Sequence, residues 1–278
     1  MSYHIVADSC CDLPESARKD PHFEIVSLTL EIGDYRIRDD ESFDQLDFIA
    51  RVAASPNPAK TACPSPEAFM RAYDHPAEDI YVVTLSSHLS GTYNAAILGR
   101  EMYLEEHPGK NIHVVDALSS CCGEAQIALR IQELCEEGKP FEEVVREAEA
   151  YRDGMMTLFV LDNLDTLRKN GRLTGVKSLV ASTLNVKPVM AGDRGVIVQK
   201  GQGIGTRKAL VKMVEILQKE AKDTISKRLM ITHVNCYERA MTVLDMILAR
   251  MKFRDAIVVD AAGVSTVYAG DGGIVVTC

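Results

Sequence analysis

The chain has 278 residues, which is enough for one large domain or two ordinary ones with a substantial buried core. Its 46% hydrophobic and 26% charged residues are typical of a globular protein. A net charge of −9, no tryptophan and 6% aromatic residues argue against a nucleic-acid or anionic-membrane binder, which needs a basic face. Any anionic ligand must therefore be held by a local site.

The first half of the chain alternates short apolar strands with helical segments. A glycine closes one predicted helix and a proline opens another, as is common at helix ends. This order predicts a mostly parallel sheet with helices on both faces. We expect strands at residues 4–7, 23–32, 79–85 and 111–116, a hairpin turn at 33–35, and helices at 93–107, 123–138 and 140–153.

The pattern restarts near Gly154. We therefore expect an α/β protein of two α/β domains, residues 1–155 with a mostly parallel sheet flanked by helices and residues 156–278 with a mixed sheet. A ligand cleft is expected between them. The predicted strands of the second half are 157–163, 186–191, 195–200, 228–234, 256–260 and 272–276, and the predicted helices are 164–171, 176–185, 206–221 and 237–251.

Three loops that follow predicted strands are rich in small hydroxyl and thiol side chains. They read "ADSCCD" (7–12), "LSSHLSGT" (85–92) and "VDALSSCCG" (115–123). In parallel sheets, ligands gather at the carboxyl ends of the strands, in the loops that lead to helices. The sequence therefore predicts a binding site where these three loops meet.

The loop at residues 85–92 does not match a catalytic signature. A hydrolase elbow needs G-x-S-x-G, but His88 stands where the first glycine belongs, and no phosphate-binding G-x-x-x-x-G-K-[ST] occurs. What remains is a helix start, where Ser90 can cap the helix and the N–H groups around Gly91 and Thr92 can face an anion. Plain helix capping and an anion site both explain these residues.

Other motifs are ambiguous when taken alone. Thr61 lies in a second loop, "KTACPSP", which precedes a predicted helix start. The basic clusters at 167–173 and 203–210 fit either a solvated face or a phosphate or partner contact. His233 ends an apolar strand and is expected to be structural, whereas His88 is expected to face solvent.

The amino terminus and the cysteines bear on location and metals. The amino terminus lacks the charged start and apolar core of a signal peptide, and no apolar run approaches the ~20 residues that span a bilayer. We therefore expect a cytoplasmic protein without stable membrane insertion. None of the eight cysteines forms a C-x-x-C motif, so we expect reduced thiols and no metal site.

Five motifs stand together in a known order: "VADSCCDLP", "TACPSP", "LSSHLSGTYNAA", "LRKNGRLTGVKSLVASTLNVKP" and "ITHVN…ERA". On these motifs the whole chain resembles the DegV family of bacterial fatty-acid-binding proteins. The resemblance implies two α/β domains with one fatty acid between them. It also implies a non-catalytic, lipid-carrying subunit without a cofactor, which presents the acyl carboxylate to a separate ATP-dependent kinase subunit that makes acyl-phosphate.

The resemblance also implies roles for individual residues. Thr61 and Ser90 would bond the carboxylate, with the Gly91 N–H nearby, and Arg172 and Arg207 would contact the kinase partner or the phosphate. The acyl tail would run through an apolar tunnel, where ~0.8 kcal/mol per buried CH₂ supplies most of the affinity. Candidate tunnel residues, for which core packing is the favoured explanation, are Met155, Met156, Leu158, Val160 and Met190.

Two departures from the family pattern stand out. Tyr268 takes the place of a histidine that helps to hold the carboxylate, and Asp271 takes the place of a proline. A tyrosine hydroxyl can still donate to a carboxylate. Ala117 and Cys121 stand where small polar residues are usual.

We therefore expect a protein that binds a long-chain fatty acid for a kinase. Two alternatives remain: a hydrolase or phosphotransferase with Ser90 as nucleophile, and a carrier or sensor of another carboxylate, which Tyr268 would favour.

Overall fold

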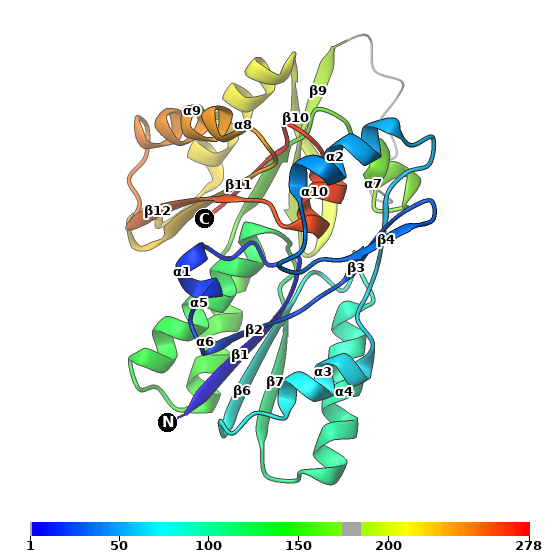
Figure 1. Ribbon diagram of the computed structural model, residues 1–278. Helices are drawn as coiled ribbons and strands as arrows, with labels where there is room; N and C mark the ends of the chain where they lie inside the picture. The colour runs from blue at the N-terminus through cyan, green and yellow to red at the C-terminus, as the bar shows by residue number, and fades with distance from the viewer. Residues whose placement is uncertain (1, 174–184) are drawn as a thin grey trace.

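Residues 2–173 and 185–278 are described by the computed structural model, in which two open sheets lie one above the other (Figure 1). The strands are β1 (Tyr3–Asp8), β2 (Phe23–Val26), β3 (Thr29–Ile32), β4 (Tyr35–Arg38), β5 (Lys60–Ala62), β6 (Asp79–Thr84), β7 (Asn111–Asp116), β8 (Thr157–Val160), β9 (Val186–Asp193), β10 (Val196–Ile204), β11 (Arg228–His233), β12 (Asp255–Asp260) and β13 (Ile274–Thr277). The α-helices are α1 (Glu15–Arg18), α2 (Gln45–Ala54), α3 (Pro66–Tyr73), α4 (Thr92–Glu106), α5 (Cys122–Glu136), α6 (Phe141–Asp153), α7 (Asp165–Lys169), α8 (Thr206–Glu220), α9 (Tyr237–Leu248) and α10 (Gly263–Ala269).

The amino-terminal sheet is parallel, with the strand order β2-β1-β6-β7. Its central strands β1 and β6 are buried along almost their whole length because both faces of the sheet are covered. Figure 1 places α5 and α6 on one face and α3 and α4 on the other. Ile5 and Val83 pack in the first of these layers, and Val6 and Val82 pack in the second.

The carboxy-terminal sheet is mixed, with the order β10-β9-β8-β13-β11-β12. Only β11 and β12 are parallel to each other, and the remaining neighbours are antiparallel. Helices α8 and α9 cover one face of this sheet (Figure 1). The other face turns toward the amino-terminal sheet. The predicted α/β fold, with a parallel first sheet and a mixed second sheet, is confirmed.

Side chains of strand β8 lie alternately on the two faces of the carboxy-terminal sheet. Leu158 and Val160 pack against the helix layer, whereas Phe159 and the following Leu161 point to the opposite side, because side chains alternate along a strand. Five apolar residues were candidates for either the acyl tunnel or the core, and none of them is in the wall of the cavity. Those residues are in the core or pack against it: Met155, Met156, Leu158, Val160 and Met190.

A small third sheet, β4-β3-β5, was predicted only in part. The hairpin of β3 and β4 turns at Gly33, whose φ of +58° suits glycine. The predicted single strand 23–32 is two strands, because β2 joins the parallel sheet while β3 leaves it. Thr61, expected in a loop, lies in β5 opposite Leu30 of β3.

Helix α10 was not predicted, and buried carboxylates hold its amino end. The Asp39 carboxylate accepts the N–H groups of Gly263 and Val264 at 2.7 and 2.8 Å, and Asp12 accepts that of Ala262 at 2.8 Å. A Cβ on Gly263 would lie 2.5 Å from Asp39 Oδ1, so only glycine permits this approach. Since Asp39 follows β4, these bonds tie α10 to the small sheet.

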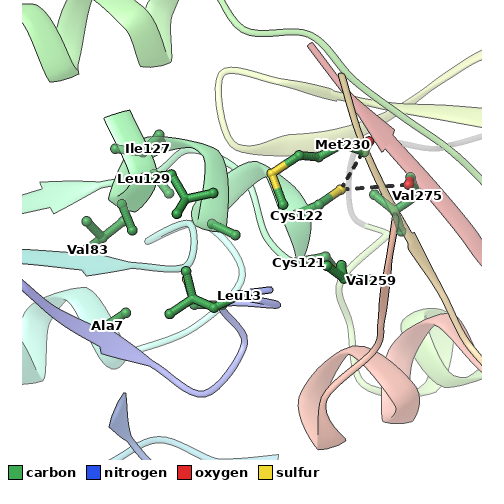
Figure 2. Close-up of a cluster of buried hydrophobic side chains, with 14 of the residues drawn as sticks. Ala7, Leu13, Val83, Cys121, Cys122, Ile127, Leu129, Met230, Val259 and Val275 are labelled. Carbon is green, nitrogen blue, oxygen red and sulfur yellow. Dashed lines mark hydrogen bonds between the residues drawn. The ribbon is translucent and has the colours of Figure 1, made fainter. Parts of the chain in front are cut away.

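The start of α5 joins the two main sheets. Figure 2 shows the Cys122 thiol directed at the carbonyl oxygens of Met230 in β11 and Val275 in β13, each 3.7 Å away. Nearby, the hydroxyls of Ser119 and Thr157 are 2.8 Å apart. One continuous apolar cluster runs through this contact, from Ala7 to Val275 (Figure 2).

Two further points concern the helices. The predicted helix 176–185 falls almost entirely outside the described residues. Within residues 2–173 and 185–278, no helix combines the length and the apolar character that a membrane span needs.

We expect Asp39→Ala to lower the free energy of unfolding by about 1–3 kcal/mol, because it leaves two buried N–H groups without an acceptor. Burial raises the pKa of Asp39, and removing that desolvated carboxyl offsets part of the loss. Urea unfolding monitored by circular dichroism measures the effect. The matched control is Asp40→Ala, since Asp40 is exposed and should change stability by less than about 0.5 kcal/mol. Equal stability of the two variants would refute this role of Asp39.

Candidate functional site

A cavity lies between the two main sheets and encloses about 820 Å³ of space not filled by protein atoms, part of it at an open mouth. Its wall comes from the loops after β1, β6 and β7, from β5, β8 and β13, from the β9–β10 hairpin, and from α7 and α10. The cleft predicted between the two halves of the chain is thus present. Apolar side chains form most of the wall, among them Leu89, Phe159, Leu161, Leu167 and Ile197.

The three hydroxyl- and thiol-rich loops meet at this cavity, as the sequence predicted. Each loop contributes to the wall, for example through Cys10, Leu85 and Ser119. The loops meet because β1, β6 and β7 are neighbours in the sheet. The Asp8 carboxylate fixes two of these loops by accepting the N–H groups of Cys10 and Leu85, both at 2.8 Å. Complete burial raises the pKa of Asp8 to about 7, although these two hydrogen bonds act in the opposite direction.

Asp116, at the end of β7, fixes the third loop. Its Oδ1 accepts the N–H of Leu118 at 3.0 Å and that of Ser87 at 3.1 Å. Leu118 has a φ of +48°, an unusual backbone conformation for leucine, and this contact helps to hold it. The loop conformations at the cavity are thus set by aspartates at the ends of the strands.

The polar groups of the wall include four of the predicted site residues. Thr61 Oγ1 and the Tyr268 hydroxyl are 3.0 Å apart, joining β5 to α10. The Arg172 guanidinium lies 5.8 Å from the centre of the Tyr268 ring, and its Nε donates to the Leu89 carbonyl at 3.1 Å. Ser90, which follows Leu89 in the chain, is the fourth of these predicted site residues in the wall. Among the described wall residues, Arg172 is the only one with a formal charge.

Ser90 lies just before the N-cap residue of α4 and bonds to the first residue of that helix. Its Oγ accepts the N–H of Thr92 at 3.3 Å and lies 2.8 Å from the Thr92 hydroxyl. Gly91 is the residue immediately before α4, with a φ of −75°, and a Cβ there would make only ordinary contact with Cys63. The N-cap of α4 is thus Gly91, which has no side-chain cap, and Ser90 forms a local hydrogen bond beside it. This bond does not exclude an anion, because Ser90 also faces the cavity.

Other predicted site residues lie elsewhere. Arg207 is exposed in the first turn of α8 and does not line the cavity. His88 is exposed, as predicted. His233 is buried with its Nδ1 3.2 Å from Asp260, and burial lowers its pKa although Asp260 opposes this, which fits the predicted structural role. Asp271 accepts a hydrogen bond from Asn235 at 3.1 Å.

Sequence reasoning missed several wall residues. Phe159 and Leu161 were passed over in favour of their neighbours, although the alternation along β8 carries the signal once the helix-covered face is known. Val264 and Ala269 belong to α10, which is too short and too evenly apolar to be seen as an amphipathic helix. Cys121, noted as a departure from the family pattern, lines the cavity.

Comparison with known proteins gives consistent matches over the whole chain. A family model described as "Uncharacterised protein, DegV family" matches residues 2–277. A DegV domain-containing protein of Streptococcus pyogenes serotype M1 is 34% identical over 281 residues, which cover 99% of this chain and 98% of the relative.

Solved structures agree with this match. A DegV family protein from Ruminococcus gnavus, refined with vaccenic acid, has a TM-score of 0.97 and 46% identity, covering 100% of this chain and 99% of the other. One from Eubacterium eligens loaded with heptadecanoic acid has a TM-score of 0.91 and 32% identity, with the same coverage. The Streptococcus pneumoniae Fatty Acid Kinase (Fak) B3 protein loaded with linoleic acid has a TM-score of 0.91 and 30% identity, again with the same coverage.

Proposed function

This chain belongs to the DegV family, and from that premise we propose that it binds a long-chain fatty acid in the cavity between its two main sheets. The supporting observation is a largely apolar cavity with hydroxyl groups and one guanidinium gathered among Thr61, Ser90, Arg172 and Tyr268. At ~0.8 kcal/mol per buried CH₂, an acyl tail supplies most of the affinity and the polar group orients the ligand.

The carboxylate is held by Thr61, Ser90 and Tyr268, and the Gly91 N–H at the start of α4 lies nearby as a further donor. One of the Thr61 and Tyr268 hydroxyls donates a hydrogen bond to the other, whereas a carboxylate in front of them accepts a hydrogen bond from each. Tyr268 thus takes the place of the family histidine as a hydrogen-bond donor. The positive end of α4 and the Arg172 guanidinium favour the negative charge.

We propose further that the protein serves a separate ATP-dependent kinase subunit. The relative named as a Fatty Acid Kinase B3 protein supports this by analogy. Arg172 beside the head group and Arg207 on the exposed start of α8 are the proposed contacts for the kinase or for the transferred phosphate. A cytoplasmic location, where ATP is present, belongs to the same proposal.

The division into residues 1–155 and 156–278 fits this function. The first part supplies Thr61 and Ser90, and the second covers the acyl tail with β8, β13 and the β9–β10 hairpin. Helix α10 belongs to the second part but packs on the first through Asp39 and Asp12, which brings Tyr268 to the head group.

The geometry of the cavity does not favour the alternative function, an enzyme with Ser90 as nucleophile. Within the described wall of the cavity no histidine, aspartate or glutamate stands ready to take a proton from Ser90. A carrier of a short carboxylate would leave most of the apolar wall uncovered.

We expect the protein to retain or take up one fatty acid per chain, detected by native mass spectrometry after mixing with vaccenic acid. Gly192→Leu should weaken the binding by at least about tenfold, because the introduced leucine side chain occupies cavity space that several methylene groups of the acyl tail would fill. The Gly192 position tolerates a Cβ, which would lie 3.6 Å from Thr157 Cβ. Gly192→Ala is therefore the control and should still bind. A wild-type protein that neither carries nor takes up an acyl chain would contradict the proposal.

Tyr268→His tests the head group. A histidine there becomes positively charged as the pH falls through about 6.5 and should then attract the carboxylate more strongly. We expect the variant to bind vaccenic acid more tightly at about pH 6 than at about pH 8, whereas wild-type affinity changes less. Isothermal titration calorimetry measures both. Parallel pH profiles for the two proteins would place the carboxylate away from residue 268.

Arg207→Ala tests the kinase contact separately from lipid binding. With a fatty acid kinase subunit and ATP, we expect acyl-phosphate formation to fall by at least about tenfold, while fatty-acid affinity stays unchanged because Arg207 lies outside the cavity. The neighbouring exposed Lys208 provides the control as Lys208→Ala. Unchanged turnover in the Arg207→Ala variant would remove this arginine from the proposed interface.

A further inference from the structure

A buried cluster of acidic and thiol groups lies beside the cavity, outside the proposed head-group site. The side chains of Asp8, Cys10 and Glu124 each offer one ligand atom, and these atoms all lie within 4.8 Å of one another. Asp8 and Glu124 are 0% exposed and Cys10 is 2% exposed. The strand β1, the loop after it and the first turn of α5 bring them together.

Glu124 is the unexplained member of this cluster. Within residues 2–173 and 185–278, neither Oε1 nor Oε2 has a hydrogen-bond partner. The groups that act on it electrostatically are Asp8, Asp12, Cys121 and Asp116, all of which disfavour its negative charge. A buried carboxylate without a partner is costly, and a protein usually offsets the cost with a cation or a hydrogen bond. Glu124 has neither from this fold.

Asp8 has a fixed orientation but spare capacity. Its two oxygens accept the N–H groups of Cys10 and Leu85, which aims the carboxylate and leaves one lone pair on each oxygen. Cys10 lies two residues further on and brings a sulfur atom to the same point. The cluster therefore presents two carboxylate oxygens and one sulfur from a rigid loop and a helix.

We propose that Asp8, Cys10 and Glu124 bind one divalent transition-metal ion, with Zn²⁺ the best match. Calcium and magnesium prefer sites made only of oxygen, whereas zinc accepts thiolate and carboxylate together. On binding, the Cys10 S–H bond breaks, a sulfur–metal bond forms, and the proton leaves to solvent. Three protein ligands leave one position of a tetrahedral zinc ion open.

The cavity gives the ion a way in. Cys10 lines the cavity wall as well as the cluster, so an ion in the cavity needs only to pass this side chain. A metal site was not expected because the cysteines lack ligands at short spacing in the sequence. Here the ligands come from two elements that are far apart in the chain.

The test uses the full-length protein, reduced, stripped with EDTA and then mixed with Zn²⁺ or Co²⁺. After gel filtration, elemental mass spectrometry should find one ion per chain. The Co²⁺ form should show a thiolate-to-metal charge-transfer band in the near ultraviolet, as expected of a sulfur ligand. A wild-type protein that retains no ion would overturn the proposal.

Variants assign the ligands. Glu124→Gln keeps the shape of the side chain and removes its charge, and it should weaken Zn²⁺ binding by at least about a hundredfold. Cys10→Ser should abolish the charge-transfer band. Cys63→Ser changes an exposed thiol outside the cluster and should leave both readouts intact. Retention of the ion by Glu124→Gln at wild-type affinity, or loss of the band in Cys63→Ser, would overturn the proposal, and circular dichroism confirms that each variant is folded.

Discussion

Buried aspartates that accept backbone N–H groups hold the cavity in its shape. Asp8 joins the loops after β1 and β6, and Asp39 and Asp12 fix the amino end of α10. Complete burial raises the pKa values of Asp8 and Asp12 to about 7, so these carboxyls occupy an unfavourable environment. They persist because the N–H groups in the loops have no other acceptor, and an unpaired buried N–H is also costly. The position of Tyr268 opposite Thr61 depends on this arrangement.

The cavity lies on the face of the second sheet that α8 and α9 do not cover, and α5 packs on part of that face at β11 and β13. The strand that supplies Leu158 and Val160 to the helix-covered core also supplies Phe159 and Leu161 to the cavity. Gly192 in β9 and Gly195 in the β9–β10 turn lack side chains where they face the same space. Close packing is the rule in protein interiors, and an apolar cavity of this kind leaves its wall atoms without partners. A ligand that fills it regains those contacts.

The sequence allowed the main architecture to be predicted, because hydrophobic period and turn residues are local signals. It also placed Thr61, Ser90 and Tyr268 as candidates that do line one cavity, through resemblance to a family. It failed where the outcome depends on contacts between distant segments. Thr61 is in a strand only because β3 is beside it, and Met190 is buried in the core although it lies on the same side of the sheet as Phe159. The buried cluster around Glu124 shares this cause, since nothing near residue 124 in the chain reveals Asp8.

The supply of hydrogen-bond donors determines which way an anionic ligand lies in the cavity. Beside Cys10, the N–H groups of Cys10 and Leu85 already bond to Asp8, and the nearby Glu124 and Asp12 are themselves acids. A carboxylate placed there would face other carboxyl groups. Around Thr61 and Tyr268, hydroxyl protons and the Arg172 guanidinium are available. The tail can tolerate contact with thiols and methyl groups, but the head group cannot tolerate contact with acids. The two ends of the cavity thus differ in their polar groups. Donors at one end direct a negative head group toward Arg172, and the acids beside Cys10 at the other end favour a cation.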